Sequence, residues 1–71
     1  MNADPTDILR GERVRAYRKA KNLTLQELAS LTNLRVETLS RIEGGKQKLG
    51  HRSAYYISKA LGVDFDYLMA R

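Results

Sequence analysis

The fold of this chain is decided by residues 23–45, which read LTLQELASLTNLRVETLSRIEGG. Thr24 and Glu27 have the spacing of a capping box, in which each side chain hydrogen-bonds the backbone N–H of the other at a helix start. Asn33 tolerates the left-handed backbone that can end a helix, and Gly44-Gly45 provides a second stop. The stretch therefore predicts two short helices, residues 24–32 and 35–43, joined by about three residues.

The apolar residues of this stretch occupy the positions that two crossing helices bury. Ala29 is small and faces inward on the first helix, where a bulky side chain would push the helices apart. The other expected buried residues are Leu28, Leu34, Leu39 and Ile42. This pattern is typical of a helix-turn-helix, which presents its second helix to the major groove of DNA.

The predicted helix 35–43 has an outer face that could read base edges. About nine residues give a helix ~13 Å long, which suits a groove ~12 Å wide. Arg41 could bond guanine, Glu37 could accept from cytosine N4, and Val36 could contact a thymine methyl, whereas Ser40 is less informative. Arg35 is a poor cap, and we hypothesise that it is retained as a base contact. In isolation, the same face would be read as an ordinary polar helix surface.

Residues on either side of this helix are candidates for phosphate contacts. The loop 44–52 reads GGKQKLGHR, and its exposed backbone N–H groups and lysines favour phosphates. Backbone N–H groups at the start of helix 24–32 can also hold a phosphate. The alternative is a solvated basic loop. The expected phosphate contacts are Thr24, Gln26, Lys46, Lys48 and Arg52.

Three further helices are expected, over about residues 4–21, 52–61 and from 64 to the end of the chain. Pro5 suits a first helical turn, Gly11 weakens the first helix, and Asp64 is a good N-cap. No segment alternates polar and apolar residues as a half-buried strand does. The prediction is an all-α, five-helix domain over residues 1–71, with residues 1–7 partly flexible.

The composition narrows the classes of function. The net charge is +5, and residues 10–52 carry eleven Lys or Arg against four Glu, which suggests a polyanion partner. There is no cysteine and one histidine, His51, so a disulfide, a catalytic metal or a cofactor is not expected. No apolar run approaches the ~20 residues of a membrane span, and the polar N-terminus does not resemble a signal peptide. We expect a cytoplasmic protein that is not an enzyme.

Four motifs in order resemble the lambda-repressor-like family of the Cro-like, or xenobiotic-response-element, type. They are RVRAYR at 13–18, LTLQELA at 23–29, TLSRIEGGK at 38–46 and ISKALGV at 57–63, followed by Leu68. The resemblance implies dimers on pseudo-palindromic DNA sites. It also implies an ion pair between Arg18 and Glu43, which would make Glu43 structural rather than a base reader.

The chain departs from the family pattern at four places, the first of which is Asn33 in place of the usual glycine of the turn. Arg35 stands where the family prefers a Ser or Thr cap, and Leu25 replaces a common Gln, which puts that phosphate contact in doubt. Leu49-Gly50 replaces a frequent Pro-Ser, so this loop is expected to be more mobile.

The predicted helices over residues 52–61 and from 64 to the chain end carry more aromatic and apolar residues than a small core needs. Tyr56, Phe65 and Met69 are expected to be partly exposed and to form a homodimer interface. The alternative is that they are scattered surface residues.

The sequence thus predicts a transcriptional regulator, most simply a bacterial or phage repressor that binds double-stranded DNA. A stand-alone Cro-like repressor, a controller of a restriction-modification operon and the DNA-binding part of a longer protein all stay open. The alternative of another class is an antitoxin-like or bridging module that binds a protein partner. RNA binding is less favoured because aromatic residues are not interleaved with the basic ones.

Overall fold

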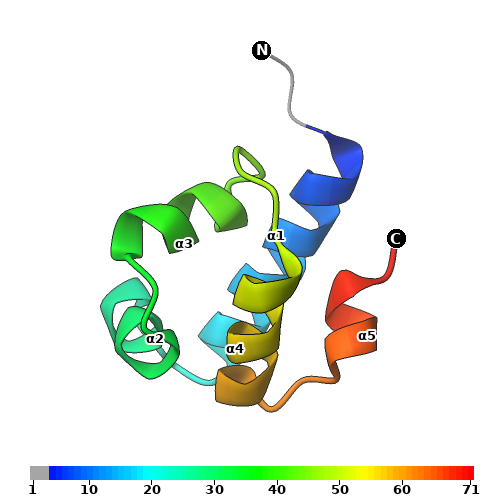
Figure 1. The fold of residues 1–71 in the computed structure, drawn as a ribbon. Helices are drawn as coiled ribbons and strands as arrows, with labels where there is room; N and C mark the ends of the chain where they lie inside the picture. Colours follow the sequence, from blue (N-terminus) through cyan, green and yellow to red (C-terminus); the bar gives the residue numbers. More distant parts are fainter. Residues whose placement is uncertain (1–3) are drawn as a thin grey trace.

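The computed structural model describes residues 4–71 and consists there of five α-helices without strands (Figure 1). They are α1 (Pro5–Ala20), α2 (Leu25–Thr32), α3 (Val36–Glu43), α4 (His51–Leu61) and α5 (Phe65–Met69). The predicted all-α fold is confirmed. Of the N-terminal segment expected to be partly flexible, residues 1–3 lie outside the described range, and Pro5 to Asp7 form the first turn of α1.

Side-chain caps set the starts of α1, α2 and α5 where the sequence indicated them, whereas α3 and α4 begin without a side-chain capping hydrogen bond. The Thr24 backbone N–H donates to Glu27 Oε1 at 2.8 Å, and the Glu27 N–H donates to Thr24 Oγ1 at 3.0 Å. Asp4 and Asp64 accept from the backbone N–H groups of Thr6 and Tyr67, respectively. Each cap satisfies donors that the first helical turn leaves without partners.

The end of the last helix differs from the expectation. α5 ends at Met69 and the backbone of Ala70 is extended, so the prediction of a helix to the chain end was wrong. Arg10 of α1 donates to the Met69 carbonyl oxygen from Nε (2.9 Å) and Nη2 (2.6 Å). Arg13 donates to the carbonyls of Tyr67 (3.1 Å) and Ala70. The two guanidinium groups thus provide hydrogen-bond donors for carbonyls at the C-terminal end of α5 that have no partner within the helix.

Every helix and the α3–α4 loop contribute to one small core. Its buried apolar residues are Val14, Leu28, Ala29, Leu39, Ile42, Leu49, Ala54, Ile57, Leu61 and Leu68. Leu49 was not expected among them. It anchors the loop that the sequence suggested to be mobile, because its side chain is only 1% exposed.

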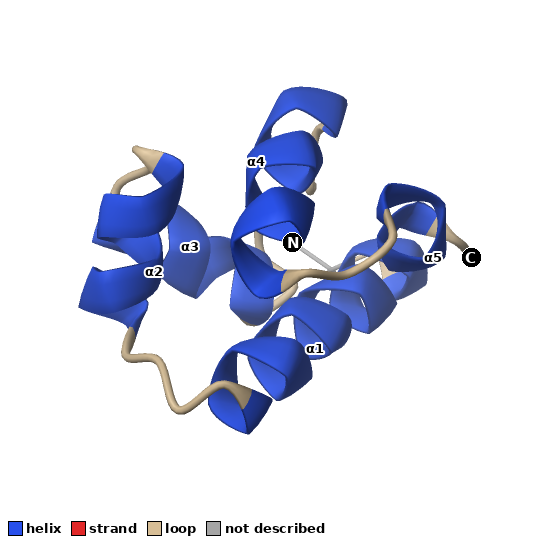
Figure 2. Ribbon diagram, turned by 90° about the horizontal axis from the view of Figure 1, so that it is seen from below, coloured by secondary structure: helices blue, strands red, loops and turns tan. Residues whose placement is uncertain are grey.

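The helices place the helix-turn-helix at one side of the molecule. Figures 1 and 2 show α4 between the α2–α3 pair and α5, and α1 packs against α3, α4 and α5. α1 and α3 approach so closely at Gly11 that a Cβ there would lie 2.0 Å from the Ile42 carbonyl oxygen. Gly11 is therefore a backbone contact point between α1 and α3, and not merely a weak helix position.

Candidate nucleic-acid interface

The turn between α2 and α3 has the geometry that the sequence predicted. Asn33 takes a left-handed conformation with φ of 59°, and Ala29 is buried where the two helices meet. Leu39 and Ile42 turn into the core, which leaves the opposite face of α3 to solvent.

The five residues predicted to contact bases differ in their exposure to solvent on that face. Glu37, Ser40 and Arg41 are exposed, whereas Val36 is half-buried and packs against the core. Arg35 is exposed at the N-cap of α3, and its side chain makes no capping hydrogen bond. The first turn of α3 therefore lacks the stabilisation that Ser or Thr would give there.

The C-terminal end of α3 is fixed by the ion pair between Arg18 and Glu43. Arg18 Nε and Nη2 donate to the two carboxylate oxygens at 2.7 and 3.0 Å, and Nη1 donates to the Leu23 carbonyl at 2.7 Å. The side chains are 11% and 7% exposed. Hydrogen bonding to Glu43 raises the pKa of Arg18 above its ordinary value, so Arg18 stays protonated at physiological pH. Because both its oxygens are used, Glu43 serves the fold.

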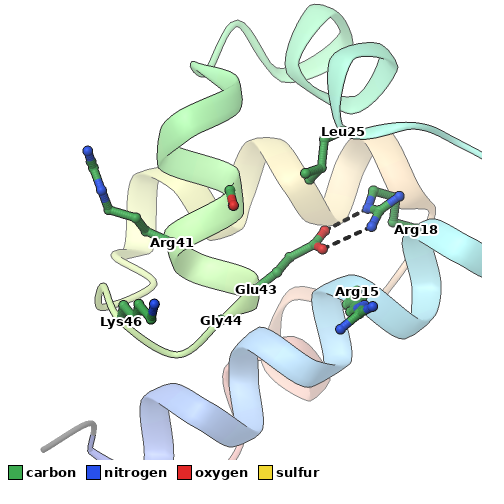
Figure 3. A pocket seen from close by; sticks show the side chains of 8 residues that line it. Arg15, Arg18, Leu25, Arg41, Glu43, Gly44 and Lys46 are labelled. Carbon is green, nitrogen blue, oxygen red and sulfur yellow. Dashed lines mark hydrogen bonds and ion pairs between the residues drawn. The ribbon is translucent and has the colours of Figure 1, made fainter.

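Two grooves flank α3. The first, which we call the arginine groove, has a volume of about 440 Å³ and opens between α1, α2 and the end of α3. In Figure 3 the Arg18–Glu43 pair lies within this groove, and the head of Arg41 extends away from it. The lining residues are Arg15, Arg18, Leu25, Ser40, Arg41, Glu43, Gly44 and Lys46.

The second groove, which we call the α2–α3 groove, runs along the start of α3. It is lined by Gln26, Ala29, Ser30, Asn33, Leu34, Arg35, Val36 and Glu37. The predicted base contacts thus divide into two sets, Ser40 and Arg41 at the arginine groove and the other three at the α2–α3 groove.

The expected phosphate contacts are spread over the same side and beyond it. The backbone N–H of Thr24 is occupied by Glu27, so Thr24 could bind a phosphate only through its hydroxyl proton. Gln26 is exposed in the α2–α3 groove, and Lys46 lines the arginine groove. Lys48 is exposed on the loop, and Arg52 is exposed beside Tyr56 on α4. These roles stay predictions.

The positive charge counted from the sequence is partly used inside the fold. Arg10 and Arg13 bind carbonyls of α5, and Arg18 binds Glu43. Arg15, which the sequence reasoning did not single out, faces the arginine groove instead. Its position three residues before Arg18 could have indicated this, because residues three apart share a helix face.

The expected dimer residues do not share one environment. Tyr56 is exposed, packs edge-on against Tyr55 with ring centroids 5.6 Å apart, and lines a cavity with Leu31. Phe65 and Met69 are half-buried and pack against the core. The role of all three in a dimer stays a prediction.

Other kinds of site were sought within residues 4–71. No helix there is long and apolar enough to cross a membrane, and no three acidic, histidine or cysteine side chains come close enough to hold a metal ion.

Comparison with known proteins places the chain in a family. Residues 14–68 match the model of the family described as helix-turn-helix (HTH_3). The chain therefore belongs to this helix-turn-helix family, whose lambda-repressor-like members are DNA-binding transcription regulators. No curated protein sequence matches it.

Solved structures show the same fold. The restriction-modification controller protein C.AhdI from Aeromonas hydrophila is 26% identical, with a TM-score of 0.83 over 87% of this chain and 94% of that protein. The P22 c2 repressor, solved in complex with a synthetic operator, is 28% identical, with a TM-score of 0.81 over 86% and 92%. A chain of the SinR protein–SinI protein complex is 31% identical, with a TM-score of 0.81 over 86% of this chain and 60% of that chain.

Proposed function

We propose that this chain is a repressor that binds a pseudo-palindromic operator as a dimer, with α3 of each copy in the major groove. The observation that carries the proposal is the exposed face of α3, where Glu37, Ser40 and Arg41 are free while the opposite face is anchored in the core. A rigid helix with free polar groups is what direct readout of base edges requires. Acting on bacterial or phage DNA, it would work in the cytoplasm.

The two grooves beside α3 suggest which residues of α3 would contact which bases. Arg41 extends outward (Figure 3) and is the best candidate for a guanine contact. Arg35, Val36 and Glu37 lie at the other end of α3, where they would meet a different base step of the same half-site. The P22 c2 repressor, whose fold this chain shares, was solved bound to an operator, and this supports the same use of α3 here.

The experiment is a fluorescence-anisotropy titration of two labelled duplexes, one carrying DNA upstream of the protein's own gene and one with that sequence scrambled. Both are titrated at several salt concentrations. We expect the upstream duplex to bind at least ~10³-fold more tightly at physiological salt. Equal affinity for the two duplexes at every salt concentration contradicts repression through this DNA.

A second candidate is binding of a protein partner through α2 and α4. Leu31 is 61% exposed, and Tyr55 and Tyr56 are 49% and 42% exposed, so this side offers apolar surface. A chain that shares the fold was solved as part of a complex of two proteins, SinR and SinI. Co-purification of a stoichiometric partner that is lost on Leu31→Ser, with DNA binding retained, would favour this candidate.

A further inference from the structure

Arg15 is a cationic side chain that has no partner within the described part of the fold. It is exposed on α1 and lines the arginine groove. Within residues 4–71 it makes no hydrogen bond or ion pair, and the salt bridge found there joins Arg18 to Glu43. Its neighbours on the helix are different, because Arg10, Arg13 and Arg18 each hold a partner in another part of the fold. Arg15 is thus the guanidinium of α1 left free to bind something else.

The groove around Arg15 keeps its positive charge. Glu43 is the one acidic side chain among the lining residues, and Arg18 occupies both of its oxygens. The carboxylate therefore does not compensate Arg15, Arg41 or Lys46. Leu25, on the α2 side, adds no polar group to the groove. Three positive charges thus border one groove without an acid to neutralise them, which favours an anion there.

The position of the groove identifies that anion as part of the DNA. Ser40 and Arg41 belong both to its lining and to the exposed face of α3. If α3 lies in the major groove as proposed, the DNA strand that borders its C-terminal end would pass the mouth of the arginine groove, because Ser40 and Arg41 line both. The phosphodiester backbone is the anionic group that DNA presents there, and a guanidinium binds phosphate oxygens through paired N–H groups.

We propose that Arg15 binds a backbone phosphate of the DNA from α1, across the arginine groove from the C-terminal end of α3. The proposal rests on DNA binding as the proposed function, and it adds a contact outside the helix-turn-helix. In this arrangement Arg41 extends towards the bases while Arg15 and Lys46 hold the backbone. A phosphate contact carries no base information, so Arg15 contributes to affinity and register for every DNA sequence alike.

The test measures affinity for a fluorescein-labelled random-sequence duplex over about 50 to 200 mM KCl, because phosphate contacts lower affinity as salt rises. Each phosphate neutralised contributes about 0.9 to the slope of log affinity against log salt. We expect Arg15→Gln to reduce that slope by about 0.9 and to weaken binding several-fold at the lower salt concentrations. Arg15→Lys should restore the slope, since one positive charge remains.

The matched control is Lys59→Gln, which removes one exposed positive charge on α4 from a residue that lines neither groove. It should leave the slope unchanged. If Arg15→Gln leaves the slope of the parent, or changes it only as much as Lys59→Gln does, the proposal for Arg15 is wrong while DNA binding stands. If the parent protein itself shows no salt-dependent binding to the duplex, the proposed function fails and this contact with it. Unfolding curves of both variants identify any loss that comes from unfolding.

Discussion

Replacing Gly11 with alanine tests the close approach of α1 and α3. The added Cβ would lie 2.0 Å from the Ile42 carbonyl oxygen, whereas real Cβ contacts are essentially never shorter than 3.0 Å. The obstacle is backbone, so no side-chain rotation can relieve it. α1 must withdraw by roughly 1 Å, which also separates the core residues and the Arg18–Glu43 pair that join the two helices.

The expected cost follows from two opposing terms. Alanine in a helix interior is favoured over glycine by about 1 kcal/mol. Overpacking against a rigid neighbour costs about 3 kcal/mol or more at the upper end of its range. The net loss should be at least about 2 kcal/mol, from a total stability of about 4–11 kcal/mol for a domain of this size. This corresponds to a fall in Tm of about 8–16 °C.

The assay is thermal and urea unfolding followed by circular dichroism. The matched control is Gly44→Ala, because Gly44 has a φ of −82° and its Cβ would meet its nearest neighbour at 3.4 Å, an ordinary contact. Gly44→Ala should change stability by no more than about 0.5 kcal/mol. If Gly11→Ala is as stable as the parent, or more so, as helix propensity alone predicts, the proposed role of Gly11 is wrong.

Two further substitutions test the ends of α3. Glu43→Ala leaves the mostly buried Arg18 guanidinium with only the Leu23 carbonyl as partner. It should cost about 2–3 kcal/mol in urea unfolding, a little less than a fully buried pair, and a loss below about 0.5 kcal/mol would mean that the pair behaves as a surface salt bridge. Arg35→Ser should stabilise the fold by about 1 kcal/mol by capping α3 while weakening operator binding in a titration. Stabilisation with unchanged affinity would show that Arg35 does not contact DNA.

Local hydrogen bonds explain which parts of the fold the sequence could predict. The capping box at Thr24 and Glu27 and the left-handed turn at Asn33 involve residues close in sequence, so their patterns indicate helix bounds directly. The residues of the Arg18–Glu43 pair are 25 positions apart in the sequence, and the pair was expected only from the resemblance to a family. It is present in the structure.

Long-range contacts explain what the sequence could not predict. Arg10 reaches the Met69 carbonyl across 59 residues, at the point where α5 ends. Nothing near Gly11 in the sequence indicates the backbone of Ile42 that lies against it. Leu49 has the sequence context of an ordinary loop residue, and its burial depends on the packing of the helices around it.

The sequence predicted which residues of α3 are exposed at the candidate interface, but not the grooves that these residues line. The sequence singled out the exposed residues of α3, because burial of Leu39 and Ile42 fixes the opposite face. It did not show that Val36 is half-buried, or that Arg15 from α1 faces the same groove as Arg41. Those facts depend on how the helices pack against one another, which only the assembled fold determines.

The most direct test of the central claim is selection of binding sites from a randomised duplex library, with sequencing of the bound fraction. The parent protein should enrich one pseudo-palindromic motif. Arg41→Ala should lose discrimination at one base position of each half-site, worth about 1–3 kcal/mol, whereas Lys46→Ala should keep the motif and bind all sequences more weakly. Enrichment of no motif by the parent, or the same motif with undiminished preference from Arg41→Ala, would contradict the account that α3 reads the DNA sequence through Arg41.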